Sequence, residues 1–92
     1  MSTAMARHIL VKDIQTADAV KERLKKGEEF ARLAKQFSTC GSKKNGGDLG
    51  EIRRGQLVKP VEKVIFTGAL KTLHGPVKSK FGYHLIQVYF RD

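Results

Sequence analysis

Three side chains of this sequence could do chemistry on a bound molecule: His8, Cys40 and His84. An imidazole gains or loses its proton close to neutral pH, and a thiol can act as a thiolate. The three residues lie far apart in the sequence, and no short-range ligand pair such as C-x-x-C or H-x-x-x-H occurs. We therefore expect neither a metal site nor a cofactor. The plainer alternative is that both histidines are hydrogen-bonded core residues and that Cys40 is a small, inert apolar one.

Both histidines lie near the start of a predicted β-strand. Residues 81–90 are rich in aromatic and β-branched side chains and contain no proline, which predicts a central strand. Residues 7–12 are a second candidate. Because both faces of the run 81–90 are mostly apolar, we expect both to be covered. Successive side chains of a strand point to opposite faces, which places His84, Ile86, Val88 and Phe90 on one face and Tyr83, Leu85, Gln87 and Tyr89 on the other.

Three helices are predicted between these strands. The first is capped by Thr16, begins at Ala17 and stops at Gly27. The second follows at once and carries an apolar stripe at the i, i+3, i+4 and i+7 positions. The third begins with Pro60 and stops at Gly68. The inward stripes comprise Phe30, Leu33, Ala34 and Phe37 in the second helix and Val61, Val64 and Ile65 in the third.

A polar, glycine-rich loop, residues 38–50, follows the second helix. Its glycine spacing resembles that of a phosphate-binding loop, but Gly47 and Asp48 stand where lysine and Ser/Thr should follow, and no strand precedes it. We therefore do not expect a nucleotide site. The dipeptide Asn45-Gly46 predicts a tight turn, residues 49–53 a short strand, and residues 74–79 a turn followed by a brief edge strand.

The predicted order is β-α-α-β-α-β-β, which indicates an α+β fold with a four-stranded, mainly antiparallel sheet surrounded by three helices. A length of 92 residues allows one domain with one core. We expect residues 1–5 to be a flexible N-terminus or an added remnant, and residues 6–92 to form the single domain.

Composition narrows the class of partner. The formal charge of +9 suggests nucleic acid or an acidic partner, but the basic residues are scattered, with no basic run interleaved with aromatics. A nucleic-acid-binding module is therefore a weaker alternative. The single cysteine excludes an intramolecular disulfide and favours a reducing compartment. With no secretory pattern and no apolar stretch of membrane-spanning length, we expect a cytoplasmic monomer without membrane association.

Five short motifs together resemble the parvulin family of peptidyl-prolyl cis/trans isomerases, in its small, stand-alone bacterial form. The resemblance runs from about Ala6 to Asp92, nearly the whole chain. Each motif alone is common, but five in this order at compact spacing are specific. The motifs are His8-Ile9-Leu10-Val11-Lys12, Phe30-Ala31-Arg32-Leu33-Ala34, Gly46-Gly47-Asp48-Leu49-Gly50, Gly75-Pro76-Val77 and Phe81-Gly82-Tyr83-His84.

The resemblance implies the roles of the site residues. It makes His8, Cys40 and His84 the catalytic residues, with the histidines on neighbouring central strands. It forms the proline pocket from Leu49, Leu57, Val61 and Phe81, and places Gln56 at the lip of that pocket. Many parvulins have phenylalanine where Val61 stands, so we expect a looser proline site here.

The resemblance also implies the reaction. Rotation about an X-Pro bond has a barrier of ~20 kcal/mol and needs no nucleophile, metal or redox cofactor, only stabilisation of the twisted amide. Parvulins that act on phosphorylated substrates carry adjacent arginines after the first strand, whereas Lys12 is followed here by Asp13. We therefore expect an isomerase for X-Pro bonds of unfolded or partly folded proteins that is not phospho-specific. A peptide-binding chaperone module with weak or no turnover is the alternative.

Overall fold

The computed structural model describes residues 3–92 and forms a sheet with the strand order β2-β1-β4-β3, in which every neighbouring pair is antiparallel. This confirms the predicted order and the α+β class. The elements are β1 (Thr3–Val11), α1 (Ile14–Lys25), α2 (Phe30–Phe37), the 3-10 helix η1 (Gly41–Asn45), β2 (Asp48–Arg53), α3 (Lys59–Thr67), β3 (Leu73–Ser79) and β4 (Gly82–Arg91).

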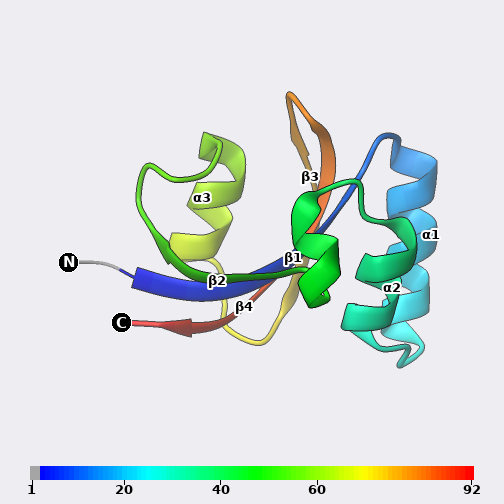
Figure 1. Ribbon diagram of the computed structural model, residues 1–92, viewed down its shortest axis with the longest axis horizontal. Helices are drawn as coiled ribbons and strands as arrows, with labels where there is room; N and C mark the ends of the chain where they lie inside the picture. Colours follow the sequence, from blue (N-terminus) through cyan, green and yellow to red (C-terminus); the bar gives the residue numbers. More distant parts are fainter. Residues whose placement is uncertain (1–2) are drawn as a thin grey trace.

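The sheet separates two layers of helix, with α3 on one face and α1 and α2 on the other (Figure 1). Each face has its own core, because the two central strands β1 and β4 alternate apolar side chains between the faces. One cluster joins α3 to the sheet through Ala4, Ala6, Ile52, Val61, Ile65, Phe66, Ile86 and Val88. The other joins α1 and α2 to it through Ile9, Val11, Ala17, Val20, Phe30, Leu33, Ala34 and Leu85. The expectation that both faces of the last strand are covered is confirmed.

A bulge near the end of β4 changes which residues share a face. Ala6 pairs with Val88 and Met5 pairs with Phe90, so the strand carries one extra residue between these pairs. The predicted alternation was therefore wrong at Phe90, which leaves the face of Ile86 and is 48% exposed. The same shift turns Arg91 toward α3, where its Nη1 donates to the carbonyl oxygens of Ile65 and Gly68, 2.9 Å from each.

The ends of β1 and α1 also differ from the prediction. The strand begins at Thr3, and Ala4 within it is fully buried, where we expected a flexible start over residues 1–5. Met1 and Ser2 lie outside the described residues. Helix α1 is capped by Asp13, whose Oδ1 accepts a hydrogen bond from the Thr16 amide, so the prediction of Thr16 as the cap was wrong. Thr16 is the donor in the first turn of the helix.

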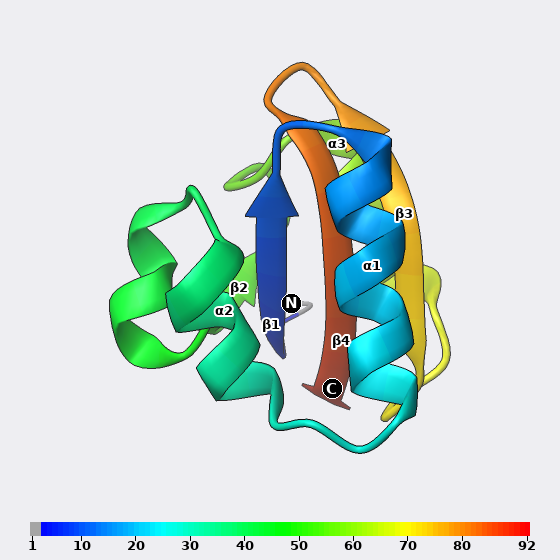
Figure 2. The ribbon, with the colours of Figure 1, turned by 90° about the vertical axis from the view of Figure 1, so that its right-hand side faces the viewer.

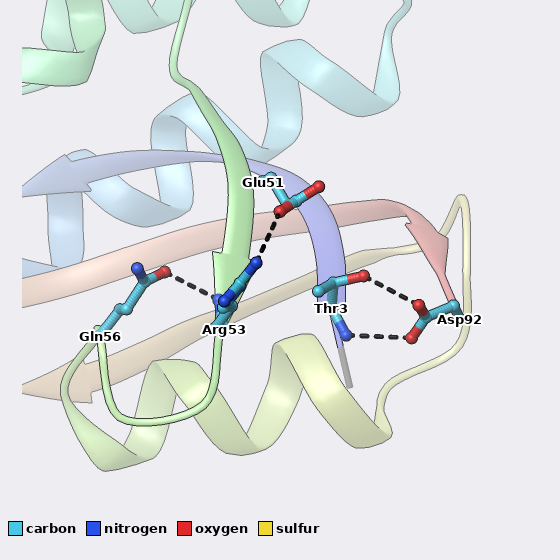
Figure 3. A network of polar contacts seen from close by, with 5 residues as sticks. All are labelled: Thr3, Glu51, Arg53, Gln56 and Asp92. Atoms are coloured by element: carbon cyan, nitrogen blue, oxygen red, sulfur yellow. Dashed lines mark hydrogen bonds and ion pairs between the residues drawn. The ribbon is translucent and has the colours of Figure 1, made fainter. Parts of the chain in front are cut away.

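The two ends of the described chain hold each other. Asp92 accepts hydrogen bonds from the backbone N–H and the Oγ1 of Thr3, both at 3.0 Å (Figure 3). The N–H of Asp92 donates to the Thr3 carbonyl. Figure 1 shows the start of β1 and the end of β4 on the same side of the fold. These hydrogen bonds hold the start of β1 against the end of β4.

Candidate active site

The structure brings His8 of β1 and His84 of β4 together on the face that α3 also packs against. Their Nδ1 atoms lie 3.2 Å apart, and the two rings are stacked with centroids 5.4 Å apart. This proximity follows from strand pairing, since Leu10 is the partner of His84 and Ile86 the partner of His8. His8 and His84 are 5% and 3% exposed as whole residues, so water is nearly excluded from both.

Burial keeps this pair neutral. The pKa of His8 is lowered from 6.5 to about 4. Desolvation is the larger cause, and the neighbouring His84 is the smaller one. Desolvation also lowers the pKa of His84. Both imidazoles are therefore uncharged at neutral pH, and each carries one N–H. A pair of this kind holds its position through hydrogen bonds and is poorly suited to gain a proton.

Ser79, the last residue of β3, extends the pair. Its Oγ lies 2.6 Å from Nε2 of His84 and accepts a hydrogen bond from the Phe81 amide at 3.1 Å. If the hydroxyl donates to His84, it still accepts from the Phe81 amide, so the Ser79 hydroxyl has a partner both as donor and as acceptor. His84 then carries its proton on Nδ1 and donates a hydrogen bond to Nδ1 of His8.

This assignment gives the chain of hydrogen bonds one direction, from the Phe81 amide through Ser79 and His84 to His8. It leaves Nε2 of His8 as a protonated donor. That atom is buried and has no hydrogen-bond partner among residues 3–92. Its N–H dipole is therefore uncompensated inside the protein. It lies at the end of the chain of hydrogen bonds formed by Ser79, His84 and His8, which we call the histidine relay.

Cys40 lies in the neighbouring loop and is partly buried. Its backbone N–H donates to Oγ of Ser38 at 3.3 Å, and the same Oγ accepts from the amide of Leu10 at 3.1 Å. Ser38 is 4% exposed, so this hydroxyl is an internal clamp between the loop and β1. The thiol makes no hydrogen bond in the part of the chain that the structure describes, and its distance to the histidines is not a hydrogen-bonding one.

The backbone at Gly47 supports His8 from the other side of the loop. The Gly47 carbonyl accepts a hydrogen bond from the His8 amide at 2.9 Å. Gly47 has a φ of 86°, and a Cβ there would lie 2.5 Å from the His8 carbonyl oxygen. Only glycine fits this close approach without displacing the strand. The glycine-rich loop thus positions a histidine, in place of the phosphate that its spacing first suggested.

The predicted proline-pocket residues separate into two groups. Leu49 and Leu57 are partly buried and pack against the cluster that contains Val61, which is itself 1% exposed. Val61 is thus a core residue, and any effect of its size reaches a ligand through the packing of its neighbours. Phe81 stands apart, 57% exposed at the β3–β4 hairpin, and its backbone N–H donates to the Ser79 hydroxyl, which contacts His84.

Gln56 is engaged within its own turn. Its Oε1 accepts a hydrogen bond from the Arg53 amide at 2.7 Å (Figure 3). The side chain is exposed, and this bond fixes the turn between β2 and α3. A contact of Gln56 with a substrate backbone stays a prediction.

Two residues of the site had no signal that singled them out in the sequence. Ser38 and Ser79 are single hydroxyls in polar segments, and only the paired strands show that they meet Leu10 and His84. A hydroxyl five residues before a strand histidine, across a tight hairpin, was the available clue for Ser79. No group of three His, Cys, Asp or Glu side chains that could hold a metal occurs among residues 3–92. No helix in this part of the chain has the length and apolar content to cross a membrane.

Comparison with known proteins shows to which family the chain belongs. Residues 8–89 match the family model of the PPIC-type PPIase domain, also called rotamase. The foldase protein PrsA of Geobacillus sp. (strain WCH70) is 49% identical over 84 residues, which is 90% of this chain and 30% of that protein. The chain therefore spans less than a third of the length of this relative.

Two solved structures match over nearly their whole length. NmPin, the parvulin of Nitrosopumilus maritimus, superposes with a TM-score of 0.86 and is 40% identical, with 98% of each chain covered. CsPin of the archaeon Cenarcheaum symbiosum superposes with a TM-score of 0.82 and is 46% identical, covering 96% of this chain and 92% of that one. With the family model and these relatives in agreement, the chain belongs to the parvulins, the PPIC-type peptidyl-prolyl cis/trans isomerases.

Proposed function

We propose that this chain accelerates rotation about X-Pro bonds in unfolded or partly folded polypeptides, by non-covalent stabilisation of the twisted amide. The observation that carries this function is the neutral, buried histidine pair tied through Ser79 to the β3–β4 hairpin. A site for bond rotation needs fixed dipoles and little water, because no proton or electron has to be transferred.

The roles of the residues follow from their surroundings. His8 and His84 are positioning residues: they are covered, uncharged and hydrogen-bonded to each other. Cys40, which is partly exposed, and the side chains of Leu49 and Leu57 are the groups available to a bound proline and its carbonyl. An apolar or mixed residue before the proline suits this site, since adjacent arginines do not follow β1. A cytoplasmic location and a monomeric state stay predictions.

Exchange spectroscopy by NMR on short X-Pro peptides tests this proposal without a coupled protease. We expect catalysed cis/trans exchange with the wild-type chain and about fivefold lower kcat/KM for Ser79→Ala, because one hydrogen bond contributes ~1 kcal/mol. Thr67→Ala, which removes an exposed hydroxyl bonded to the Lys63 carbonyl on α3, is the matched control and should retain full activity.

Three results would redirect or refine the proposal. Peptide-induced shifts around His84 and Leu57 without faster exchange would favour the chaperone module that binds but does not turn over. Equal losses in Ser79→Ala and Thr67→Ala would show that the relay has no specific part in the reaction. A rate unchanged by Cys40→Ala would make the thiol a neutral wall of the site.

A further inference from the structure

The opposite face of the sheet carries a groove that the isomerase site does not use. It consists of two adjoining cavities of about 490 and 330 Å³ that share Arg7, Lys71 and Gln87 in their walls. We call it the Arg7 groove. Figure 2 shows β1 and β4 running between α1 and α2 on this face. No residue of the histidine relay lines either cavity, and the larger one has a size typical of ligand sites.

Arg7 is held rigidly in this groove. Its Nε and Nη2 both donate to Oε1 of Gln87, at 2.9 and 2.5 Å, and its Cζ lies 4.5 Å from the centroid of the Phe30 ring. The guanidinium therefore keeps a fixed plane, while its Nη1 donates to no acceptor among residues 3–92. Its neutral partners leave its charge uncompensated. A fixed guanidinium with free N–H groups suits a carboxylate.

Lys71 brings a second positive charge to the same place. Its backbone adopts a φ of 59°, unusual for a residue with a side chain, and its N–H donates to the Val88 carbonyl at 2.6 Å. This bond fastens the loop before β3 onto β4. Lys71 lines both cavities. It forms no ion pair in residues 3–92.

The acidic side chains that face the groove are already engaged. Both carboxylate oxygens of Glu28 accept from Arg23 at 2.8 Å. Oδ1 of Asp48 accepts from the Gly50 amide and from the Tyr89 hydroxyl, at 2.8 and 2.9 Å. Asp48 is bonded only to neutral groups and keeps its negative charge in the larger cavity, but Arg7 and Lys71 together outweigh it, so the net charge there is positive. Partly buried apolar walls made by Leu24, Leu73 and Tyr89 adjoin these charges.

We propose that the Arg7 groove binds an acidic segment of an extended polypeptide. An Asp or Glu carboxylate of the segment pairs with Arg7 and Lys71, and an adjacent apolar side chain packs against the partly buried Leu24 and Leu73. The net charge of +9 favours the approach of such a segment. The proposal rests on the proposed function only in taking a polypeptide as the ligand, and it needs no proline.

A titration of the ¹⁵N-labelled full chain with the proline-free peptide acetyl-Phe-Glu-Leu-amide tests the groove alone. We expect amide shifts at Arg7, Lys71 and Gln87 and none at Ser79 or His84. The peptide with Gln in place of Glu should bind at least about fivefold more weakly, because it lacks the charge. Added salt should weaken binding of the Glu peptide and leave the Gln peptide unaffected.

Variants separate the groove from the general basic surface. Lys71→Gln should weaken binding about two- to fivefold, as expected for a solvent-exposed ion pair. Lys63→Gln removes an exposed lysine of α3, on the other face, and should have no effect. Arg7→Gln should weaken binding about tenfold, and its amide spectrum shows directly whether it folds. If Arg7→Gln does not fold, Lys71→Gln decides.

Several outcomes would overturn the proposal. They are equal binding of the Glu and Gln peptides, shifts centred on His84, equal effects of Lys71→Gln and Lys63→Gln, or no shifts at all. Tighter binding of a short oligouridylate at the same amides would assign the groove to nucleic acid instead. None of these results depends on X-Pro exchange, so failure of the groove and failure of the isomerase are distinguishable.

Discussion

Arg7 and His8 are neighbours on β1, yet they meet opposite conditions. His8 is 5% exposed, faces Ile86 across the strand pair and stays neutral, with a pKa lowered to about 4. Arg7 faces Gln87, is partly exposed and keeps its charge in an open groove. Strand alternation thus places a dehydrated site and a hydrated cationic one a single residue apart. The sheet therefore separates a buried, uncharged site on one face from a positively charged groove on the other.

The largest effect should come from shortening a buried side chain of β4, the strand that contributes to both cores. Leu85→Ala and Ile86→Ala each remove a fully buried side chain, one from each core, and each should lower the free energy of unfolding by about 2–5 kcal/mol. At a temperature where both variants stay folded, only Ile86→Ala should reduce X-Pro exchange, because Ile86 is the partner of His8. Urea unfolding and exchange spectroscopy measure the two quantities.

Phe90→Ala is the control for this comparison, since Phe90 is 48% exposed beyond the bulge. It should cost about 0.5 kcal/mol or less. Equal losses of activity in Leu85→Ala and Ile86→Ala, at matched stability, would show that the two faces are not independent.

A smaller effect is expected from pH, and it sharpens the contrast between Arg7 and His8. The pKa of His8 is about 4 in the folded protein against 6.5 as the ordinary value, so the unfolded chain takes up this proton first. The contribution of His8 to stability is complete above pH 6.5 and is lost as the pH falls toward 4. The shift corresponds to a loss on the order of 3 kcal/mol. Urea midpoints measured across this window should show it.

His8→Gln should flatten that dependence, although His84, whose pKa is also lowered, contributes in the same direction. Arg7→Gln, where it folds, should leave the slope unchanged because the guanidinium stays charged throughout this range. A slope unaltered in His8→Gln would contradict the assignment of the dependence to the buried ring.

The smallest effect concerns the helix that borders the Arg7 groove. Asp13→Ala removes the side-chain cap of α1 and should lower the melting temperature by a small, measurable amount. Asp18→Ala deletes an exposed carboxylate within the same helix and should cost nothing measurable. Thermal unfolding of the two variants compares cap and surface directly. Equal melting temperatures of the two variants would show that the Asp13 cap does not stabilise α1.

Features encoded locally were the ones that the sequence predicted best. The stripe of α2 places Phe30, Leu33 and Ala34 in the core as expected, because a helix fixes its own periodicity. The face of Phe90 depends on how β4 pairs with β1, and no pattern within one strand reveals a bulge. The cap of α1 was misassigned because Asp13 and Thr16 both have cap-forming side chains, and only the backbone shows which accepts.

The candidate site was predictable only in part. The meeting of His8 and His84 followed from the family resemblance, and strand pairing explains it. The hydroxyls of Ser38 and Ser79 are defined by partners 28 and 5 residues away, across two different pairs of segments. The burial of Val61 depends on how α3 docks onto the sheet. Such contacts between elements leave no periodic trace in the sequence.

The hydrogen bonds between Thr3 and Asp92 hold the first and last described residues close together. Antiparallel strands lie about 4.8 Å apart, so the chain leaves almost where it enters. The unit could therefore be spliced into a surface loop of a host protein without stretching that loop. For the same reason, the two ends could be joined by a short Gly-Ser bridge and the chain reopened at an exposed turn, giving a circular permutant with the same strand neighbours.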